Sequence, residues 1–170
     1  DQLGVTPESV SLSSDGSFIA VGAGMAGSSY TFRGYVRIYQ NVNNSWVQVG
    51  DYINGEAKGD ASGKGISLSS DGTVVAIGAP DNGSENRGHV RVFQNINNNW
   101  VQIGSDIDGE FDSDDSGIAV SLSSDGNVVA IGAPDNWSTR ENFESGHVRI
   151  YKNINNNWIQ IGSDIQGEGE

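Results

Sequence analysis

The sequence predicts an all-β protein made of three four-stranded antiparallel repeats of about 54 residues each. The string SLSSDG occurs three times, at 11–16, 67–72 and 121–126. The pattern G-[YH]-V-R-[IV] also occurs three times, at 34–38, 88–92 and 146–150. Self-similarity at a nearly fixed period indicates a repeat architecture, and no segment has the spacing of apolar residues that an amphipathic helix needs.

The first two strands of a repeat can be followed in the second copy. Its SLSS segment, 67–70, has the length and pattern of a short strand, and Asp71 and Gly72 come directly after it. Asp-Gly between two apolar segments is a strong signal for a two-residue β-hairpin, so we expect the chain to reverse there. The β-branched run 73–77 then predicts the second strand.

The third and fourth strands follow a loop whose length differs between the copies, at 24–33, 80–87 and 134–145. In the second copy, residues 89–94 alternate between apolar and polar side chains, and an Asn-rich turn then leads into an apolar segment that begins with Trp100. This pattern predicts a meander of four strands. Insertions confined to one loop of each repeat often mark a binding face.

Four antiparallel strands with a period near 50 residues are typical of a β-propeller blade. We therefore expect blades at 1–54, 55–108 and 109–170, the last including the start of a further linker. The alternative is a threefold all-β domain such as a β-prism or a β-trefoil, because propellers typically have about four blades or more. The tail 163–170 copies the start of the inter-repeat linker and the head 1–4 copies its end, which predicts a longer array or head-to-tail association of copies.

Two Gly-Ala-Pro triplets that follow β-branched strands, at 78–80 and 132–134, resemble the GAP element of FG-GAP repeats. The FG positions of that family fall on 3–4, 62–63 and 116–117, where the phenylalanine is absent. The resemblance implies a propeller like that of the integrin α-subunit and of many secreted bacterial surface proteins. It therefore also implies an extracellular or cell-surface location.

The resemblance does not extend to calcium binding between the first two strands. Family members that bind calcium there carry a longer loop of the form D-x-D-x-D-G. Here the connection is only Ser-Ser-Asp-Gly, as at 69–72. A two-residue hairpin cannot supply the six to eight oxygen atoms that calcium takes, so we expect no calcium in that loop.

The linker between the second and third repeats is a better candidate for calcium. After Asp106 it carries five more acids, namely Asp108, Glu110, Asp112, Asp114 and Asp115. Hard oxygen ligands at alternating positions suit calcium, which is the one cofactor that the sequence suggests. The alternative is an ordinary solvated linker, and the corresponding segment 51–63 favours it because that segment has fewer acids and includes Lys58.

The variable loops supply the candidate ligand contacts. Asp81 and Asn82 open the second loop, and Asp135 and Asn136 hold the corresponding place in the third, followed by Trp137. A loop that combines a tryptophan with polar side chains is typical of a ligand contact. The alternative is a tryptophan that folds onto its own repeat.

Two histidines occupy equivalent positions in the second and third repeats. His89 and His147 correspond to Tyr35 in the first repeat. A position that accepts either residue type indicates packing within a strand, so we expect no catalytic residue there. The arginine two positions further along each repeat is expected to pair with an acid of the same blade.

The chain carries 22 acidic and 9 basic residues, which gives a formal net charge of -13, and it has no cysteine. This excess of acid argues against nucleic acid as a partner, because neutralising phosphates needs clustered Lys and Arg. No apolar run approaches the ~18 residues of a membrane span, so we expect no membrane insertion.

Repetition also argues against an enzyme, because catalytic sites are usually singular and these repeats differ little outside one loop. We therefore expect a non-enzymatic extracellular module for cell-surface adhesion or structural spacing, which presents an acidic loop face to surface proteins. One alternative is a lectin-like propeller that binds glycans, with or without calcium. Another is an accessory domain of a secreted polysaccharide-degrading enzyme.

Overall fold

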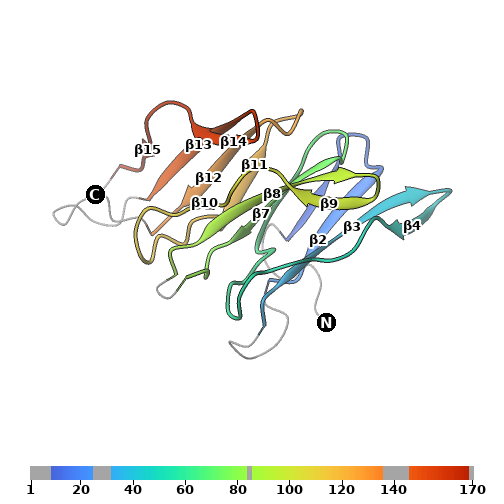
Figure 1. Ribbon diagram of the computed structural model, residues 1–170, viewed down its shortest axis with the longest axis horizontal. Helices are drawn as coiled ribbons and strands as arrows, with labels where there is room; N and C mark the ends of the chain where they lie inside the picture. Colours follow the sequence, from blue (N-terminus) through green and yellow to red (C-terminus); the bar gives the residue numbers. More distant parts are fainter. Residues whose placement is uncertain (1–8, 25–31, 84–85, 136–145, 169–170) are drawn as a thin grey trace.

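A computed structural model describes residues 9–24, 32–83, 86–135 and 146–168 of the chain. It confirms the all-β prediction: these residues form three antiparallel sheets and no helix. The sheets follow one another in chain order and lie side by side, with the first on the right of the view in Figure 1 and the third on the left. The described residues do not close into a ring.

Each sheet contains five strands. The first sheet comprises β1 (Val10–Leu12), β2 (Phe18–Gly22), β3 (Tyr35–Val42), β4 (Ser45–Gln48) and β5 (Ile53–Asn54). The second comprises β6 (Gly65–Leu68), β7 (Val74–Ala79), β8 (His89–Ile96), β9 (Asn99–Gln102) and β10 (Ile107–Asp108). The third comprises β11 (Ala119–Leu122), β12 (Val128–Ala133), β13 (His147–Ile154), β14 (Asn157–Gln160) and β15 (Ile165–Gln166).

The third strand of each sheet carries two partners on its outer edge. In the second sheet, β8 pairs with β7 on one side, and on the other side it pairs first with β10 and then with β9. The four-strand meander was predicted, whereas the two-residue strand that follows it was not, because two residues show no alternation. This short strand returns the linker to the start of β8, beside His89.

The hairpin between the third and fourth strands is the tight one. Asn97 and Asn98 both have positive φ, 53° and 63°, and the flanking Ile96 and Asn99 pair directly. Positive φ at both central residues is the requirement of a type I′ turn, which asparagine tolerates well. The equivalent Asn-Asn pairs of the other two repeats have the same geometry.

The prediction of a two-residue hairpin at Asp-Gly was wrong. In the first repeat the amide of Ser13 donates to the carbonyl of Phe18 at 3.0 Å, so four residues separate the paired ends. The reason is the side chain of Asp15, which accepts hydrogen bonds from the backbone and hydroxyl of Ser17 at 2.9 and 2.7 Å. These bonds hold a wider turn in which Gly16 alone has positive φ.

The core lies between the sheets. One apolar cluster joins the first and second sheets and includes Ile38 and Ile77, while another joins the second and third and includes Val92 and Val129. All six residues of β7 are buried, because both faces of the middle sheet are covered. Burial of each such side chain stabilises the fold by about 1.5–3 kcal/mol.

Neighbouring sheets are also joined by hydrogen bonds that repeat from one junction to the next. The amide of Ser14 donates to the carbonyl of Ser70, and the amide of Ser70 donates to the carbonyl of Ser124, each at 2.9 Å. The indole of Trp100 donates to the carbonyl of Val49 at 2.9 Å. The corresponding bond of the next junction runs from Trp158 to Ile103 at 2.8 Å.

Candidate functional site

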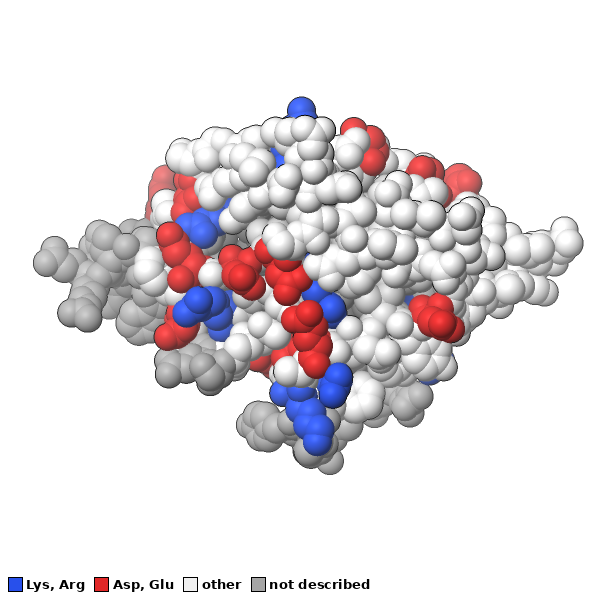
Figure 2. Space-filling view, in the orientation of Figure 1, with Lys and Arg blue, Asp and Glu red and all other residues white. Residues whose placement is uncertain are grey.

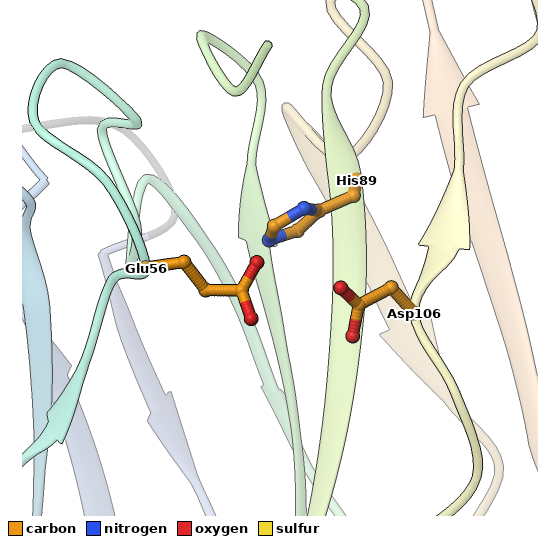
Figure 3. Close-up of side chains that lie close together, drawn as sticks. All are labelled: Glu56, His89 and Asp106. Atoms are coloured by element: carbon orange, nitrogen blue, oxygen red, sulfur yellow. The ribbon is translucent and has the colours of Figure 1, made fainter.

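The candidate site lies at the start of β8, where the linkers between sheets meet the middle sheet. Glu56 follows β5 of the first sheet, His89 begins β8, and Asp106 immediately precedes β10. Antiparallel pairing of β10 with β8 sets Asp108 opposite His89, so the linker acid two residues earlier comes close to the histidine. The three side chains point toward one another in Figure 3.

These three residues form a tight cluster of metal-ligand type. One ligand atom from each of Glu56, His89 and Asp106 lies within 4.8 Å of the other two. Among the described residues, no other group of three His, Cys, Asp or Glu side chains meets that spacing. Glu56 is exposed, Asp106 is half-buried and His89 is only 1% exposed, so the cluster reaches from the surface into the sheet junction.

Among the described residues, the Glu56 and Asp106 carboxylates have polar partners in the surrounding protein, and the Nε2 atom of His89 has none. Arg91 donates to the carbonyl oxygen of Asn54 at 2.7 Å and lies 3.5 Å from the Glu56 carboxylate. Gln102 donates to the Asp106 carboxylate at 2.7 Å. The Nε2 atom of His89 is buried and has no hydrogen-bond partner.

Burial keeps the His89 imidazole neutral. Desolvation lowers the pKa of His89 below its ordinary value of 6.5, and the positive charge of Arg91 lowers it further. The negative charges of Asp106 and Glu56 raise the pKa, but they do not reverse the effect of burial. A neutral imidazole can accept a proton or bind a cation.

The third repeat has the same residue types in a different arrangement. His147 and Asp164 correspond to His89 and Asp106, but Arg149 now bonds to both nearby acids. Its guanidinium donates to Asp164 at 3.1 and 2.9 Å and also to Glu110. Burial opposes the charged form, yet the bonds to Asp164 and the charge of Glu110 raise the pKa of Arg149 above its usual value. The acids there are neutralised by an arginine.

The first repeat replaces the same cluster by aromatic rings. Tyr35 and Tyr52 stack with their ring centroids 5.5 Å apart. The Arg37 guanidinium lies 5.0 Å from one ring centroid and 4.3 Å from the other. Such cation–π contacts help to hold the guanidinium over the two rings. The expected pairing of the arginine with an acid thus fits Arg91 and Arg149, while Arg37 packs on tyrosines.

Three of the five linker acids predicted to bind calcium have separate partners among the described residues. Glu110 bonds to Arg149, and Asp112 forms a 3.0 Å ion pair with Arg87. Buried Asp114 accepts hydrogen bonds from the amides of Glu110 and Phe111, both at 2.8 Å, and so shapes its own loop. The two remaining acids of the set are exposed Asp108 and half-buried Asp115. Calcium at this linker stays a prediction.

The structure brings residues of the two variable loops close to the same linker. Burial and the negative charges of Asp135 and Asp81 raise the pKa of Asp115, so each of the two loop acids acts electrostatically on this linker acid. Asp81 also lies 3.6 Å from the ammonium group of Lys64. Asn82 closes a turn in which its backbone N–H donates to the carbonyl oxygen of Ala79 at 3.1 Å. The other two predicted ligand contacts, Asn136 and Trp137, lie outside the described residues.

Sequence reasoning missed the cluster of Glu56, His89 and Asp106. The histidine position was interpreted as packing, and its neighbours come from two different linkers. The signal that was present is the co-occurrence, in one repeat junction, of a histidine after the variable loop with acids in the linkers on both sides. The short strand β10, which brings Asp106 to His89, had no sequence signature.

Charged side chains are unevenly distributed on the face seen in Figure 2. Acidic and basic side chains gather in a band over the region of β10 and β8, while the part near β3 and β4 is mostly uncharged.

The described residues contain no helix that could span a membrane.

Comparisons with known proteins identify similarity in structure but not in sequence. No family model matches the chain, and no curated protein matches it. A crystal structure described as a putative 6-phosphogluconolactonase from Bacteroides uniformis matches with a TM-score of 0.62 and 15% sequence identity. The match covers 97% of this chain and 43% of that protein, so the chain spans less than half of the neighbour's length. The resemblance to FG-GAP repeats stays a prediction.

This neighbour overturns the expectation of a non-enzymatic adhesion or spacing module, because it carries the name of an enzyme. Repetition of the strands does not make the repeats chemically equivalent. The repeats share their strands and turns, but the equivalent positions Tyr35, His89 and His147 stand in three different environments. Only the second repeat gathers a buried histidine and two carboxylates within 4.8 Å, among the residues that the structure describes. A repetitive chain can therefore carry a singular site.

Proposed function

We propose that this chain is a section of a β-propeller hydrolase that acts on an uncharged sugar lactone or a related ester. The observation that carries the proposal is the cluster of Glu56, His89 and Asp106, with a buried histidine nitrogen that has no hydrogen-bond partner in the part of the chain that the structure describes. The name of the structural neighbour supports the reaction class, since a lactonase opens a cyclic ester with water. The extracellular location expected from the sequence is a separate proposal.

The propeller arrangement is supported by the repetition of one junction. The first strands lie in a row, with β6 in contact with both β1 and β11. At each junction the tryptophan of the later sheet bonds to the earlier one, as Trp100 does to Val49 and Trp158 to Ile103. Successive sheets related by the same displacement form a ring when enough of them are present. A threefold β-prism would instead bring β11 back against β1.

The outer sheets carry complementary halves of this junction. Trp46 of the first sheet corresponds to Trp100 and Trp158 but is 48% exposed. In the third sheet, no described atom lies within 4 Å of a Cβ added at Gly162, whereas a Cβ added at the equivalent Gly104 would collide with Trp158. A groove of about 380 Å³ beside Gly132 lies on the same sheet. We propose that equivalent sheets, from further repeats or from another copy of the chain, cover these ends head to tail.

The chemistry of the cluster suits ester hydrolysis. Opening a lactone requires a water molecule to lose a proton as its oxygen attacks the carbonyl carbon, and the ring oxygen to gain a proton as the carbon–oxygen bond breaks. Neutral His89 and the carboxylates of Glu56 and Asp106 are groups that can activate such a water. Exposed Glu56 gives the cluster an approach from solvent.

The charge of the chain indicates which lactone fits. A phosphorylated substrate, as in the name of the neighbour, carries negative charge, and this chain has a formal net charge of -13. Acidic surfaces repel anions and reduce their local concentration. Hydroxyl groups of an uncharged sugar, in contrast, can donate hydrogen bonds to exposed carboxylates such as Glu56 and Asp108.

The test is the rate of lactone opening, followed as acid release in a pH-stat. We expect the chain to open glucono-1,5-lactone faster than buffer does, and to open the 6-phosphorylated lactone less efficiently. The Glu56→Gln variant should lose at least about tenfold in kcat/KM, since it removes one carboxylate of the cluster. Rates equal to the spontaneous rate for both lactones would contradict the proposal.

A further inference from the structure

We propose that Glu56, His89 and Asp106 form a binding site for a divalent metal ion, and that zinc is the ion that fits best. This inference rests on the proposed function, because it takes the cluster as the hydrolytic site. It adds that a bound metal ion would activate the water molecule there.

The geometry needs only a small contraction to reach that of a zinc site. The three ligand atoms lie within 4.8 Å of one another. Tetrahedral zinc with bonds of about 2.0–2.2 Å holds its ligand atoms about 3.4 Å apart. The Glu56 side chain is 47% exposed and projects from a linker, so it can move by the required distance without disturbing the core.

The buried nitrogen of His89 is an independent observation that points to a ligand. Its Nε2 atom has no hydrogen-bond partner within the described ranges, although the residue is only 1% exposed. Leaving a buried polar atom unpaired destabilises a folded protein, and such atoms usually have a partner. The side chain lies among the carboxylates of Glu56 and Asp106 in Figure 3. A cation held between the three would satisfy the nitrogen and both acids.

The ligand set selects the ion. Imidazole nitrogen suits zinc and other transition metals, whereas calcium and magnesium prefer oxygen ligands alone. Three protein ligands from His and carboxylate residues leave the fourth position of zinc for water, as in catalytic rather than structural zinc sites. Zinc lowers the pKa of such a water toward neutrality and so generates the nucleophile that ester hydrolysis needs.

The neighbouring arginines explain why we propose zinc binding in the second repeat and not in the third. Arg91 bonds to the carbonyl oxygen of Asn54 and reaches Glu56 only at 3.5 Å, so the carboxylate can turn to a cation without leaving the arginine unpaired. In the third repeat Arg149 bonds directly to both Glu110 and Asp164. Its charge occupies the place that a metal ion would take.

The experiment measures zinc binding to the chain after removal of metals with a chelator. Isothermal titration with Zn²⁺, and the metal content after gel filtration, should give one zinc ion per chain. His89→Asn and Glu56→Gln should weaken binding by about 100-fold or more, because each removes a ligand. The matched controls His147→Asn and Glu110→Gln should bind zinc within about twofold of the unchanged chain. Circular dichroism checks that each variant is folded.

Each outcome of this experiment supports or contradicts the proposed zinc site. Since Glu56 is exposed, Glu56→Gln tests the site even where His89→Asn does not fold. No stoichiometric zinc in the unchanged chain overturns the inference, as does an equal loss of zinc in the controls from the third repeat. Zinc binding without lactone hydrolysis keeps the site and removes the proposed function. Hydrolysis without zinc binding supports the proposed function and overturns the zinc site, and His89 would then act as a proton acceptor.

Discussion

The indole nitrogen Nε1 of Trp100 donates a hydrogen bond of 2.9 Å to the carbonyl oxygen of Val49, which joins the fourth strand of the second sheet to the first sheet. The same bond recurs one repeat later between Trp158 and Ile103 at 2.8 Å. The tryptophan of each repeat therefore belongs to the junction between sheets. Its fixed distance from the preceding strand in sequence follows from this role.

Replacing Trp100 by phenylalanine should destabilise the chain by about 1–2 kcal/mol. The change keeps an aromatic ring but leaves the buried carbonyl of Val49 without its donor. The matched variant Trp46→Phe should have almost no effect on the isolated chain, because Trp46 is 48% exposed. Urea unfolding followed by circular dichroism measures both. Equal losses of stability in the two variants would contradict the role of the indole at the junction.

Gly78→Ala should destabilise the chain by more than about 2 kcal/mol, since an added Cβ would collide with the backbone of Gly117 in the next linker. The equivalent change Gly132→Ala should be nearly neutral for folding of the isolated chain, because the nearest atom to its added Cβ is that of Ala119 at 3.3 Å. Thermal unfolding at low protein concentration compares the two variants. A neutral Gly78→Ala would show that the sheets are not packed as closely as the structure has them.

The proposed head-to-tail contact predicts that the chain associates as its concentration rises. Trp46→Ala should weaken association by at least about tenfold, because large aromatics at the centre of an interface carry much of its energy. The neighbouring Val47→Ala serves as control, since alternation along the strand places Val47 on the opposite face. Sedimentation equilibrium measures the association constant. A chain that stays monomeric at millimolar concentration would contradict association between copies. Further repeats would then be the remaining way to cover the outer sheets.

The exposed aspartates of the Ser-Asp-Gly turns should titrate unusually low. Hydrogen bonds from Ser123 and from Asn127 lower the pKa of Asp125 from 3.8 to about 2. Because the pKa in the folded chain lies below that in the unfolded chain, the stabilisation is complete above about pH 4 and is lost as the pH falls through about 2. Carboxyl carbon shifts in nuclear magnetic resonance measure this pKa. Ser123→Ala should raise it toward 3.8, and an unchanged value would refute the assigned cause.

Much of the fold could be predicted because each strand and turn has a local signature that recurs three times. The Asn-Asn turns and the alternation of 89–94 are examples. The Asp-Gly turn was predicted too short, since the hydrogen bonds of Asp15 to Ser17 outweigh the usual preference of the dipeptide. The short strand β10 could not be predicted, because pairing with β8, and not its two-residue sequence, defines it.

The candidate site could not be predicted for a related reason. Glu56, His89 and Asp106 lie in separate segments and meet only through the pairing of β10 with β8 and the packing of one sheet on the next. The sequence also gives no indication that Arg149 turns to the acids of its junction while Arg91 turns to a backbone carbonyl. This difference in the hydrogen-bond partner of the arginine distinguishes two repeats that have almost the same residues.

The most direct test of the account compares the same substitution in two equivalent positions. Asp106→Asn removes a carboxylate from the cluster of the second repeat, and Asp164→Asn removes its counterpart from the ion pair of the third. With glucono-1,5-lactone as substrate, we predict that Asp106→Asn lowers kcat/KM by at least about tenfold and that Asp164→Asn leaves it unchanged. Equal activities in the two variants, or a loss confined to Asp164→Asn, would contradict the assignment of the functional site to the second repeat.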